Sequence, residues 1–218
     1  MKKRIIFVAG LLILLTTINF QQKFFFSSFN LEKIIIENNI LLTEKEIKKL
    51  LIPLYNKNLL ILKNEKIEKT LMQNSFIEGF SIKKKYPKTL KIKIYEKKPI
   101  AIFIKKEKKF YLSENIDLIE FKELNNYYDL PHVYGNVKEF KTFYNDLKKI
   151  KFPFNQLIKI QLFDSNRWDM ETLDNKLIRL PPKNYKESLE NYIQLKNKNN
   201  FNKYKVFDYR INNQLILK

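Results

Sequence analysis

The chain has 218 residues, of which 44% are hydrophobic and none is cysteine, so it can bury one large or two small cores but has no disulfides, thiolate metal sites or cysteine nucleophiles. Its 42 Lys and Arg against 23 Asp and Glu give a formal net charge of +19. Because only four of these basic residues are arginines and the lysines are scattered among Asn, Ile, Phe and Tyr, the surplus indicates an AT-rich genome rather than a nucleic-acid-binding surface.

A hydrophobic run near the N-terminus indicates a membrane anchor. Residues Ile5 to Phe20 carry no charge and follow the basic tail Met1–Arg4. Continued as a helix to Phe26, the run is long enough to cross the roughly 30 Å hydrocarbon core of a bilayer. We predict a cytoplasmic tail at residues 1–4 and a transmembrane anchor at residues 5–26 that contacts membrane lipid. The bulk of the chain is then exported, because basic residues beside a span favour the cytoplasmic side.

The alternative for this run is a signal peptide that is removed by cleavage. Cleavage requires small residues soon after the apolar core, and the first small pair here is Ser27–Ser28. A retained anchor is therefore the preferred interpretation, and it makes the protein a single-pass type II membrane protein with a cytoplasmic N-terminus.

The exported part is predicted to begin with a small α+β unit at residues 28–98. Leu31–Glu37 is typical of a strand, and Asn38–Asn39 supplies a turn after it. Two helices follow, the first opened by the capping box Thr43–Glu46 and the second by Asn64. Their apolar faces hold Ile47, Leu50 and Leu51 in the first helix and Ile67, Leu71 and Met72 in the second.

Two alternating segments complete this unit. Phe76–Tyr86 and Lys88–Tyr95 have the period-two pattern of strands, and Pro87 separates them because proline cannot donate to a strand ladder. The order strand, helix, helix, strand, strand predicts one sheet with both helices on one face.

Strands dominate the second predicted unit, residues 99–218. They are expected at Ile100–Ile104, Lys109–Leu112, Leu118–Phe121, Leu157–Phe163, Arg167–Thr172, Lys176–Leu180, Val206–Arg210 and Gln214–Leu217. Two helices interrupt them, opened by Asn136 with Glu139 and by Asn184 with Glu187. Their buried faces are expected to hold Phe140, Phe143, Tyr144 and Leu147, and Leu189, Tyr192 and Ile193. The fold class is therefore α+β, with a mainly antiparallel sheet in the second unit.

No catalytic, metal-binding or cofactor-binding site is predicted. His132 is the only histidine, and it lies in a predicted loop between a proline and a glycine, with no second histidine to share a metal. The three glycines are too far apart for a phosphate-binding loop. The five-residue spacing of Asp164, Asp169 and Asp174 fits carboxylates that line a site, and it is equally typical of turns. We expect neither an enzyme nor a small-molecule substrate.

Three stretches of the chain, in this order, resemble the FtsQ/DivIB cell-division family. The first is Phe76–Ala101, which has a proline between two strands and ends in Glu-Lys-x-Pro-Ile-Ala. The second is Leu130–Gly135, which leads into a helix. The third runs from Arg167–Trp168 through a Leu-Pro pair to Phe207–Ile211. The resemblance implies a POTRA domain for the first unit and the family's C-terminal β domain for the second.

The resemblance also implies a non-catalytic division scaffold in the bacterial inner membrane, with its bulk in the periplasm at the septum. Its POTRA domain would recruit other septal divisome proteins, and its distal domain would bind the bitopic proteins FtsB and FtsL. Asn38–Asn39, Asn115 and Asn175 stand where the family usually has glycine. Asparagine tolerates positive φ better than most residues, so these turns are expected to survive.

The predicted partner-binding site is the C-terminal edge of the second unit. If residues 211–218 form the last strand of the sheet, their unpaired backbone groups offer a template for a partner strand. Arg210 is expected to bind an acidic partner residue, and Ile211, Leu215 and Leu217 to contact the partner. The alternative for the two leucines is that they only close the core. We assign three further residues to the core: Trp168, Phe207 and Val206.

Two other functions stay open. One is a POTRA-type periplasmic chaperone that acts in protein export. The other is a membrane-anchored exported hydrolase, for which His132 would be the first residue to test.

Overall fold

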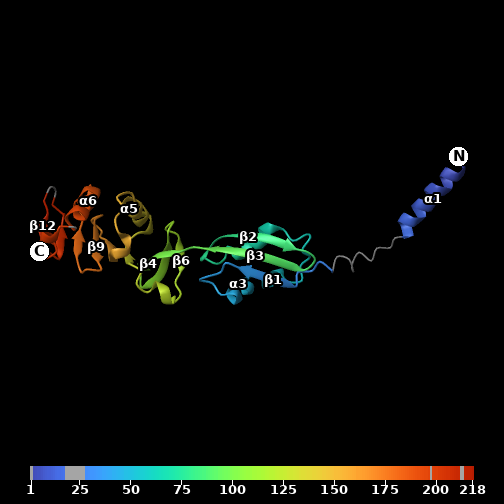
Figure 1. The fold of residues 1–218 in the computed structure, drawn as a ribbon, viewed down its shortest axis with the longest axis horizontal. Helices are drawn as coiled ribbons and strands as arrows, with labels where there is room; N and C mark the ends of the chain where they lie inside the picture. The colour runs from blue at the N-terminus through green and yellow to red at the C-terminus, as the bar shows by residue number, and fades with distance from the viewer. Residues whose placement is uncertain (1, 18–27, 197, 212–213) are drawn as a thin grey trace. The chain divides into compact units, whose positions relative to one another are not determined.

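The computed structural model describes residues 2–17, 28–196, 198–211 and 214–218. The chain divides into two units, residues 1–96 and 97–218 (Figure 1). Helix α1 (Lys2–Thr17) covers the first part of the predicted anchor, and residues 18–26 of that prediction lie outside the described residues. Among the described residues, no helix combines the length and the apolar character that a membrane crossing requires.

After α1, the first unit consists of a three-stranded sheet and two α-helices. Its elements are β1 (Lys33–Glu37), α3 (Glu44–Leu50), the short helix η1 (Ile52–Leu54), α4 (Asn64–Leu71), β2 (Ile77–Lys85) and β3 (Thr89–Glu96). β3 lies in the centre, parallel to β1 and antiparallel to β2 (Figure 1). The predicted order of strands and helices is confirmed.

The start of α3 agrees with the sequence prediction, and the start of α4 does not. Thr43 Oγ1 accepts a hydrogen bond from the Glu46 N–H at 3.2 Å, and the Glu46 carboxylate accepts one from the Thr43 N–H at 2.6 Å, so the predicted capping box is confirmed. The prediction for α4 is wrong, because Lys63 occupies the cap without a side-chain bond and Asn64 is already helical. Ile67 and Leu71 are buried as predicted, whereas Met72, the residue that follows the last one of α4, is 49% exposed.

Glu96 fixes the loop between β1 and α3. Its carboxylate accepts hydrogen bonds from the backbone N–H groups of Ile40 at 3.0 Å, Leu41 at 2.6 Å and Leu42 at 2.9 Å. Three N–H groups that precede the helix thus share one charged acceptor, and such bonds are stronger than neutral ones. The glutamate of the Glu-Lys-x-Pro-Ile-Ala stretch therefore has a structural role.

The second unit contains a nine-stranded sheet. Its strands are β4 (Pro99–Lys105), β5 (Lys108–Ser113), β6 (Leu118–Glu120), β7 (His132–Tyr134), β8 (Leu157–Leu162), β9 (Trp168–Thr172), β10 (Leu177–Arg179), β11 (Val206–Asp208) and β12 (Ile216–Leu217). Their spatial order is β12-β11-β10-β9-β8-β7-β4-β5-β6. The helices are α5 (Val137–Lys149) and α6 (Tyr185–Lys196), with short helices η2 (Asn125–Tyr127), η3 (Phe154–Gln156) and η4 (Asn199–Phe201).

Parallel pairing is the feature of this sheet that the sequence prediction understated. Five of the eight strand pairs are antiparallel, but β4–β7, β7–β8 and β10–β11 are parallel. Parallel neighbours need a crossover, and α5 and α6 supply it between β7 and β8 and between β10 and β11. His132 lies in β7, so its assignment to a loop is wrong: the strand is too short to show an alternating pattern.

Of the two helix caps predicted in the second unit, the structure shows one. Asn136 Oδ1 accepts hydrogen bonds from the N–H groups of Lys138 at 2.8 Å and Glu139 at 3.4 Å, which confirms the predicted cap of α5. Asn184 precedes α6 with a φ of 57°, a left-handed turn conformation rather than the extended one of a typical N-cap.

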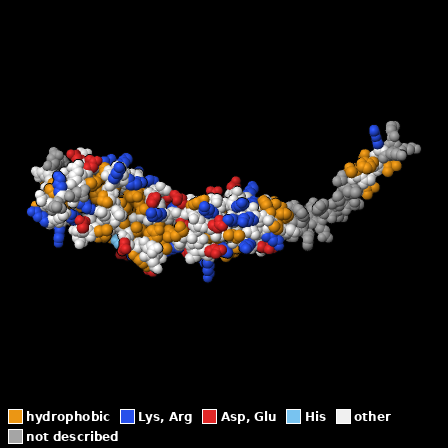
Figure 2. Space-filling model, in the orientation of Figure 1, with side chains coloured by type: hydrophobic (Ala, Val, Ile, Leu, Met, Phe, Trp, Pro, Cys, Tyr) orange, Lys and Arg blue, Asp and Glu red, His pale blue; other side chains and the backbone are white. Residues whose placement is uncertain are grey.

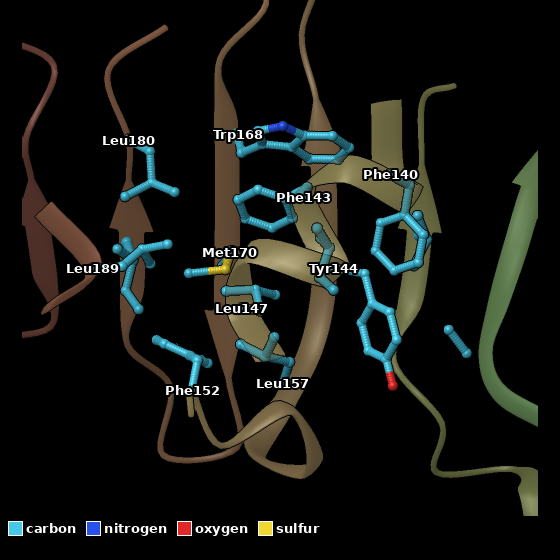
Figure 3. Close-up of a cluster of buried hydrophobic side chains, with 14 of the residues drawn as sticks. Phe140, Phe143, Tyr144, Leu147, Phe152, Leu157, Trp168, Met170, Leu180 and Leu189 are labelled. Carbon is cyan, nitrogen blue, oxygen red and sulfur yellow. The ribbon is translucent and has the colours of Figure 1, made fainter. Parts of the chain in front are cut away.

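The core of the second unit lies between α5, α6 and one face of the sheet. Trp168 from β9 stacks on Phe143 from α5, with ring centroids 4.5 Å apart and an angle of 15° between the planes (Figure 3). Phe140 and Met170 lie beside this pair (Figure 3). Trp168 is 4% exposed and Phe207 is fully buried, so both core assignments are confirmed, whereas Val206 is only half-buried.

Positive φ angles occur at asparagines more often than at glycine. Asn38 (φ 63°) and Asn175 (φ 58°) adopt the predicted left-handed conformation, but beside Asn115 it is Ile116 that does so (φ 62°). Gly135 has a φ of +131°, and a Cβ there would lie 2.6 Å from Leu162 Cβ. This position therefore requires glycine for two reasons, its φ angle and the absence of space.

Candidate protein-binding edge

β12 lies at one end of the nine-stranded sheet and pairs with β11. Within the described residues no strand pairs with its other side. The strand is shorter than the predicted 211–218, because only Ile216–Leu217 have strand geometry. Ile211 lies before it, and residues 212–213 lie outside the described residues.

The backbone of β12 leaves donor and acceptor groups on the outer side. Lys218 N–H donates to the Val206 carbonyl at 3.2 Å, and Val206 N–H donates to the Lys218 carbonyl at 3.0 Å. In an antiparallel ladder, alternate residues turn their N–H and C=O groups to opposite sides. The Leu217 N–H and C=O therefore point away from β11, where a further strand can pair with them.

The side chains of this segment divide between the two faces of the sheet. Leu215 and Leu217 are half-buried and pack against the core, which favours the alternative that they close it. Ile216 is 38% exposed on the opposite face, and Ile211 is 51% exposed. Ile216 was missed in the sequence, although strand alternation next to two core leucines indicates an outward residue there.

Arg210 is held by its own chain. Its Nε donates to Asp208 Oδ1 at 2.9 Å, and its Nη2 donates to Asp208 Oδ2 at 2.6 Å, which is a two-point clamp. Arg179 approaches the same carboxylate, with its Nη1 3.7 Å from Oδ2. A partner carboxylate that binds Arg210, as predicted, therefore has to compete with Asp208 of the same chain.

A row of opposite charges crosses the sheet on the face away from the core. Asp169, Arg179, Asp208 and Ile216 are successive cross-strand neighbours. Arg167 adds a second contact to Asp169, its Nε lying 3.3 Å from Oδ1. Three of the four arginines of the chain, Arg167, Arg179 and Arg210, thus form ion pairs with the two carboxylates on this face.

Two carboxylates of this row have pKa values that shift in opposite directions. The hydrogen bonds from Arg210 hold the pKa of Asp208 below its ordinary value, against the opposing effect of burial. Burial raises the pKa of Asp169, and the neighbouring Arg167, Arg179 and Arg210 offset this only in part. The charged form of Asp208 is therefore the one that the fold stabilises.

Replacing Asp208 with asparagine is expected to lower the free energy of unfolding of the second unit by about 1–3 kcal/mol at neutral pH, because a buried charged acceptor is lost. A depressed pKa stabilises the fold above the unfolded-state pKa of about 3.9 and loses this effect as pH falls, so the difference from wild type should shrink below about pH 4. Urea unfolding followed by the fluorescence of Trp168, the single tryptophan, measures it. The exposed Asp164→Asn is the control; equal stability of both variants would contradict the prediction.

A groove of about 470 Å³ lies beside β12. It brings together Ile211 and Leu215, which the sequence predicted, with residues that it did not predict. These further lining residues are Pro181, Lys183, Asn184, Glu187, Ser188, Asn191, Tyr209 and Gln214. Six of these eight lie between residues 181 and 191, in the segment that leads into α6 and in the first part of that helix. Because they are about twenty or more residues away from Ile211 and Leu215 in sequence, no local pattern reveals them. Arg210 and Leu217 do not line the groove.

The residues considered for chemistry are dispersed. His132 is half-buried in β7, and burial together with the charge of Lys109 lowers its pKa. Asp169 belongs to the charged row, and Asp174 accepts a hydrogen bond from Thr172 Oγ1 at 2.6 Å in a turn. In the part of the chain that the structure describes, no three His, Asp or Glu side chains converge as metal ligands.

Comparison with known proteins identifies both units. A model of the POTRA domain, FtsQ-type, matches residues 29–97, and one of the cell division protein FtsQ/DivIB, C-terminal, matches residues 103–210. The cell division protein FtsQ of Rickettsia typhi is 31% identical over 192 residues, which is 85% of this chain and 71% of the relative. The FtsQ of Rickettsia felis is 30% identical over 216 residues, 95% of this chain and 79% of the relative.

A solved structure is also similar. The major extracytoplasmic domain of the trans isomer of DivIB from Geobacillus stearothermophilus aligns with 46% of this chain and 92% of its own, at 16% identity and a TM-score of 0.34. That likeness is too weak to support an argument, and the assignment depends on the sequence matches, which span both units. The chain belongs to the FtsQ/DivIB family of cell division proteins.

Proposed function

We propose that this cell division protein is a non-catalytic scaffold that binds small bitopic division proteins of the FtsB and FtsL type by strand addition to β12. The observation that supports it most directly is the outer side of β12, where the Leu217 N–H and C=O have no strand beside them in the described chain. A partner strand gains affinity from such backbone bonds and specificity from pockets for alternate side chains. The groove at Ile211 and Leu215 supplies one such pocket.

The proposed location is the inner membrane at the septum. The uncharged run Ile5–Phe20, of which residues up to Thr17 are helical in α1, anchors the chain, and the basic residues before it keep the N-terminus in the cytoplasm. The two units then lie in the periplasm. The POTRA domain contributes to recruitment by contacting further septal proteins.

Photo-crosslinking in dividing cells tests the binding edge. A photoreactive amino acid at Ile216 or Ile211 is expected to capture a small bitopic division protein. The matched control is Leu118, which is 44% exposed in β6 at the other end of the same sheet. Capture from Leu118 at the same level, or no capture by a folded protein at the septum, would refute strand addition at β12.

Depletion of the protein separates the proposed function from its rivals. Filamentous cells are expected, because septation fails while growth continues. Unfolded exported protein without filamentation would favour a chaperone in export instead, and loss of an activity in a folded His132 variant would favour a hydrolase.

A further inference from the structure

One end of the POTRA unit carries exposed apolar and basic side chains together. This end, which we name the basic tip, is where the described chain resumes at Ser28 and where β2 turns into β3. Its three segments are residues 28–32, 57–63 and 84–88.

Backbone and ring contacts join these three segments. The Leu59 N–H donates to the Phe29 carbonyl at 2.8 Å, and the Phe29 ring meets the Tyr86 ring edge-on with centroids 6.2 Å apart. The Glu32 N–H donates to the Lys88 carbonyl at 3.0 Å. These contacts hold the three segments together as one surface.

The middle segment presents two aliphatic side chains outward. Leu59 and Leu62 are buried, whereas Leu60 is 41% exposed and Ile61 is 73% exposed. The Leu60 N–H is bound to Asn58 Oδ1 at 2.9 Å, which fixes the turn that holds them out. Tyr86, 54% exposed, adds an aromatic ring on the neighbouring segment. Folding alone gains little from leaving these side chains in water.

The two ends of the POTRA unit differ in charge. The basic tip contains five lysines, at positions 57, 63, 84, 85 and 88, against one acidic residue, Glu32. The segments at the opposite end of the sheet, residues 37–43, 74–78 and 94–96, contain three glutamates and no lysine. Figure 2 shows basic and hydrophobic side chains side by side at the tip end of this unit.

We infer that the basic tip docks onto the surface of the anionic membrane in which the chain is anchored. Tyrosine and aliphatic side chains enter the headgroup region, and lysines beside them bind acidic headgroups while their stems cover apolar surface. The inference rests on the proposed anchor: if α1 lies in the bilayer, the ten residues 18–27 reach at most about 35 Å, which keeps Ser28 near the membrane. The opposite, glutamate-bearing end then faces away from the anionic surface.

A depth measurement on the full-length protein in vesicles tests this docking. Because the chain has no cysteine, Ile61→Cys gives a single site for an environment-sensitive fluorophore. The matched control is Ile40→Cys at the opposite end of the same unit, where the isoleucine is 82% exposed. In vesicles of phosphatidylglycerol and phosphatidylethanolamine, we expect blue-shifted emission and strong quenching by doxyl-labelled lipid at position 61, and water-like emission without quenching at position 40.

Charge reversal tests the electrostatic part. Lys57→Glu with Lys85→Glu, both exposed, should abolish most of the quenching at position 61. The same reversal at the exposed helix residues Lys45 and Lys69 should leave it unchanged. Added salt or phosphatidylcholine vesicles should weaken the quenching, because surface attraction falls off within a Debye length of about 8 Å at physiological salt.

The other outcomes each reject the inference. Protein that floats with the vesicles but shows water-like emission at position 61, or equal quenching at positions 61 and 40, rejects docking and leaves the anchor standing. Protein that does not float with vesicles rejects the anchor and the docking together. Emission that shifts at position 61 only after other division proteins are added would show that the tip binds protein and not lipid.

Discussion

Replacing Trp168 with alanine is expected to lower the free energy of unfolding of the second unit by about 3–5 kcal/mol, the usual cost of removing a large buried aromatic side chain. Trp168 is 4% exposed, stacks on Phe143 at 4.5 Å and meets Phe140 edge-on at 6.2 Å. These contacts join β9 to α5, so the cavity would open between the sheet and the crossover helix (Figure 3).

The conservative variant Trp168→Phe is the control, since it keeps one aromatic ring against Phe143 and should cost less. Hydrogen exchange of peptides from β8 and β9 measures the loss of stability in this unit alone. Tryptophan fluorescence cannot be used, because Trp168→Ala removes the single tryptophan. Exchange in β2 and β3 of the POTRA unit should stay at the wild-type rate. Equal protection of β9 in wild type and Trp168→Ala would contradict the core assignment.

Replacing Leu217 with proline is expected to weaken binding of the captured bitopic partner by about tenfold or more. Proline removes the outward N–H, a loss of about 1 kcal/mol, and its ring stands where the partner strand must approach. The bonds between Lys218 and Val206 do not involve the Leu217 N–H, so β12 should stay on the sheet. Affinity of the purified full-length protein for that partner is the measurement.

Two further variants distinguish the contribution of the Leu217 backbone to partner binding from that of its side chain. Leu217→Ala keeps the N–H and removes the half-buried side chain, so a smaller loss of binding is expected. Lys218→Pro removes a donor to Val206 and should disturb the intramolecular pairing, which hydrogen exchange in β11 would reveal. If Leu217→Pro binds the partner like wild type, the outer side of β12 is not the interface.

The POTRA unit was predictable because its signals are local. The capping box at Thr43, the alternation in β2 and β3 and the turn at Asn38 each lie within a few residues, and each is present in the structure. In the second unit, β7 was missed because three residues carry no readable period. Its pairing with β4 and β8 is a long-range property that one segment does not encode.

The binding edge was partly readable. Residues two apart in a strand share a face, so the clamp between Asp208 and Arg210 was available from spacing alone, as was the outward direction of Ile216. The groove was not, because α6 and the segment around Ile211 meet only after folding. The sequence therefore indicated where the edge lies but not which side chains remain free on it.

In the described part of the chain, five asparagines in left-handed turns suggest how this fold tolerates biased mutation of its gene. Asn38, Asn56, Asn166, Asn175 and Asn184 all have φ near 60°, the conformation for which glycine is the usual choice. Codons rich in A and T encode asparagine, whereas glycine codons begin with two guanines, so biased mutation can exchange one for the other wherever only φ matters. Gly135 marks the limit of that exchange, because Leu162 leaves no room for any side chain.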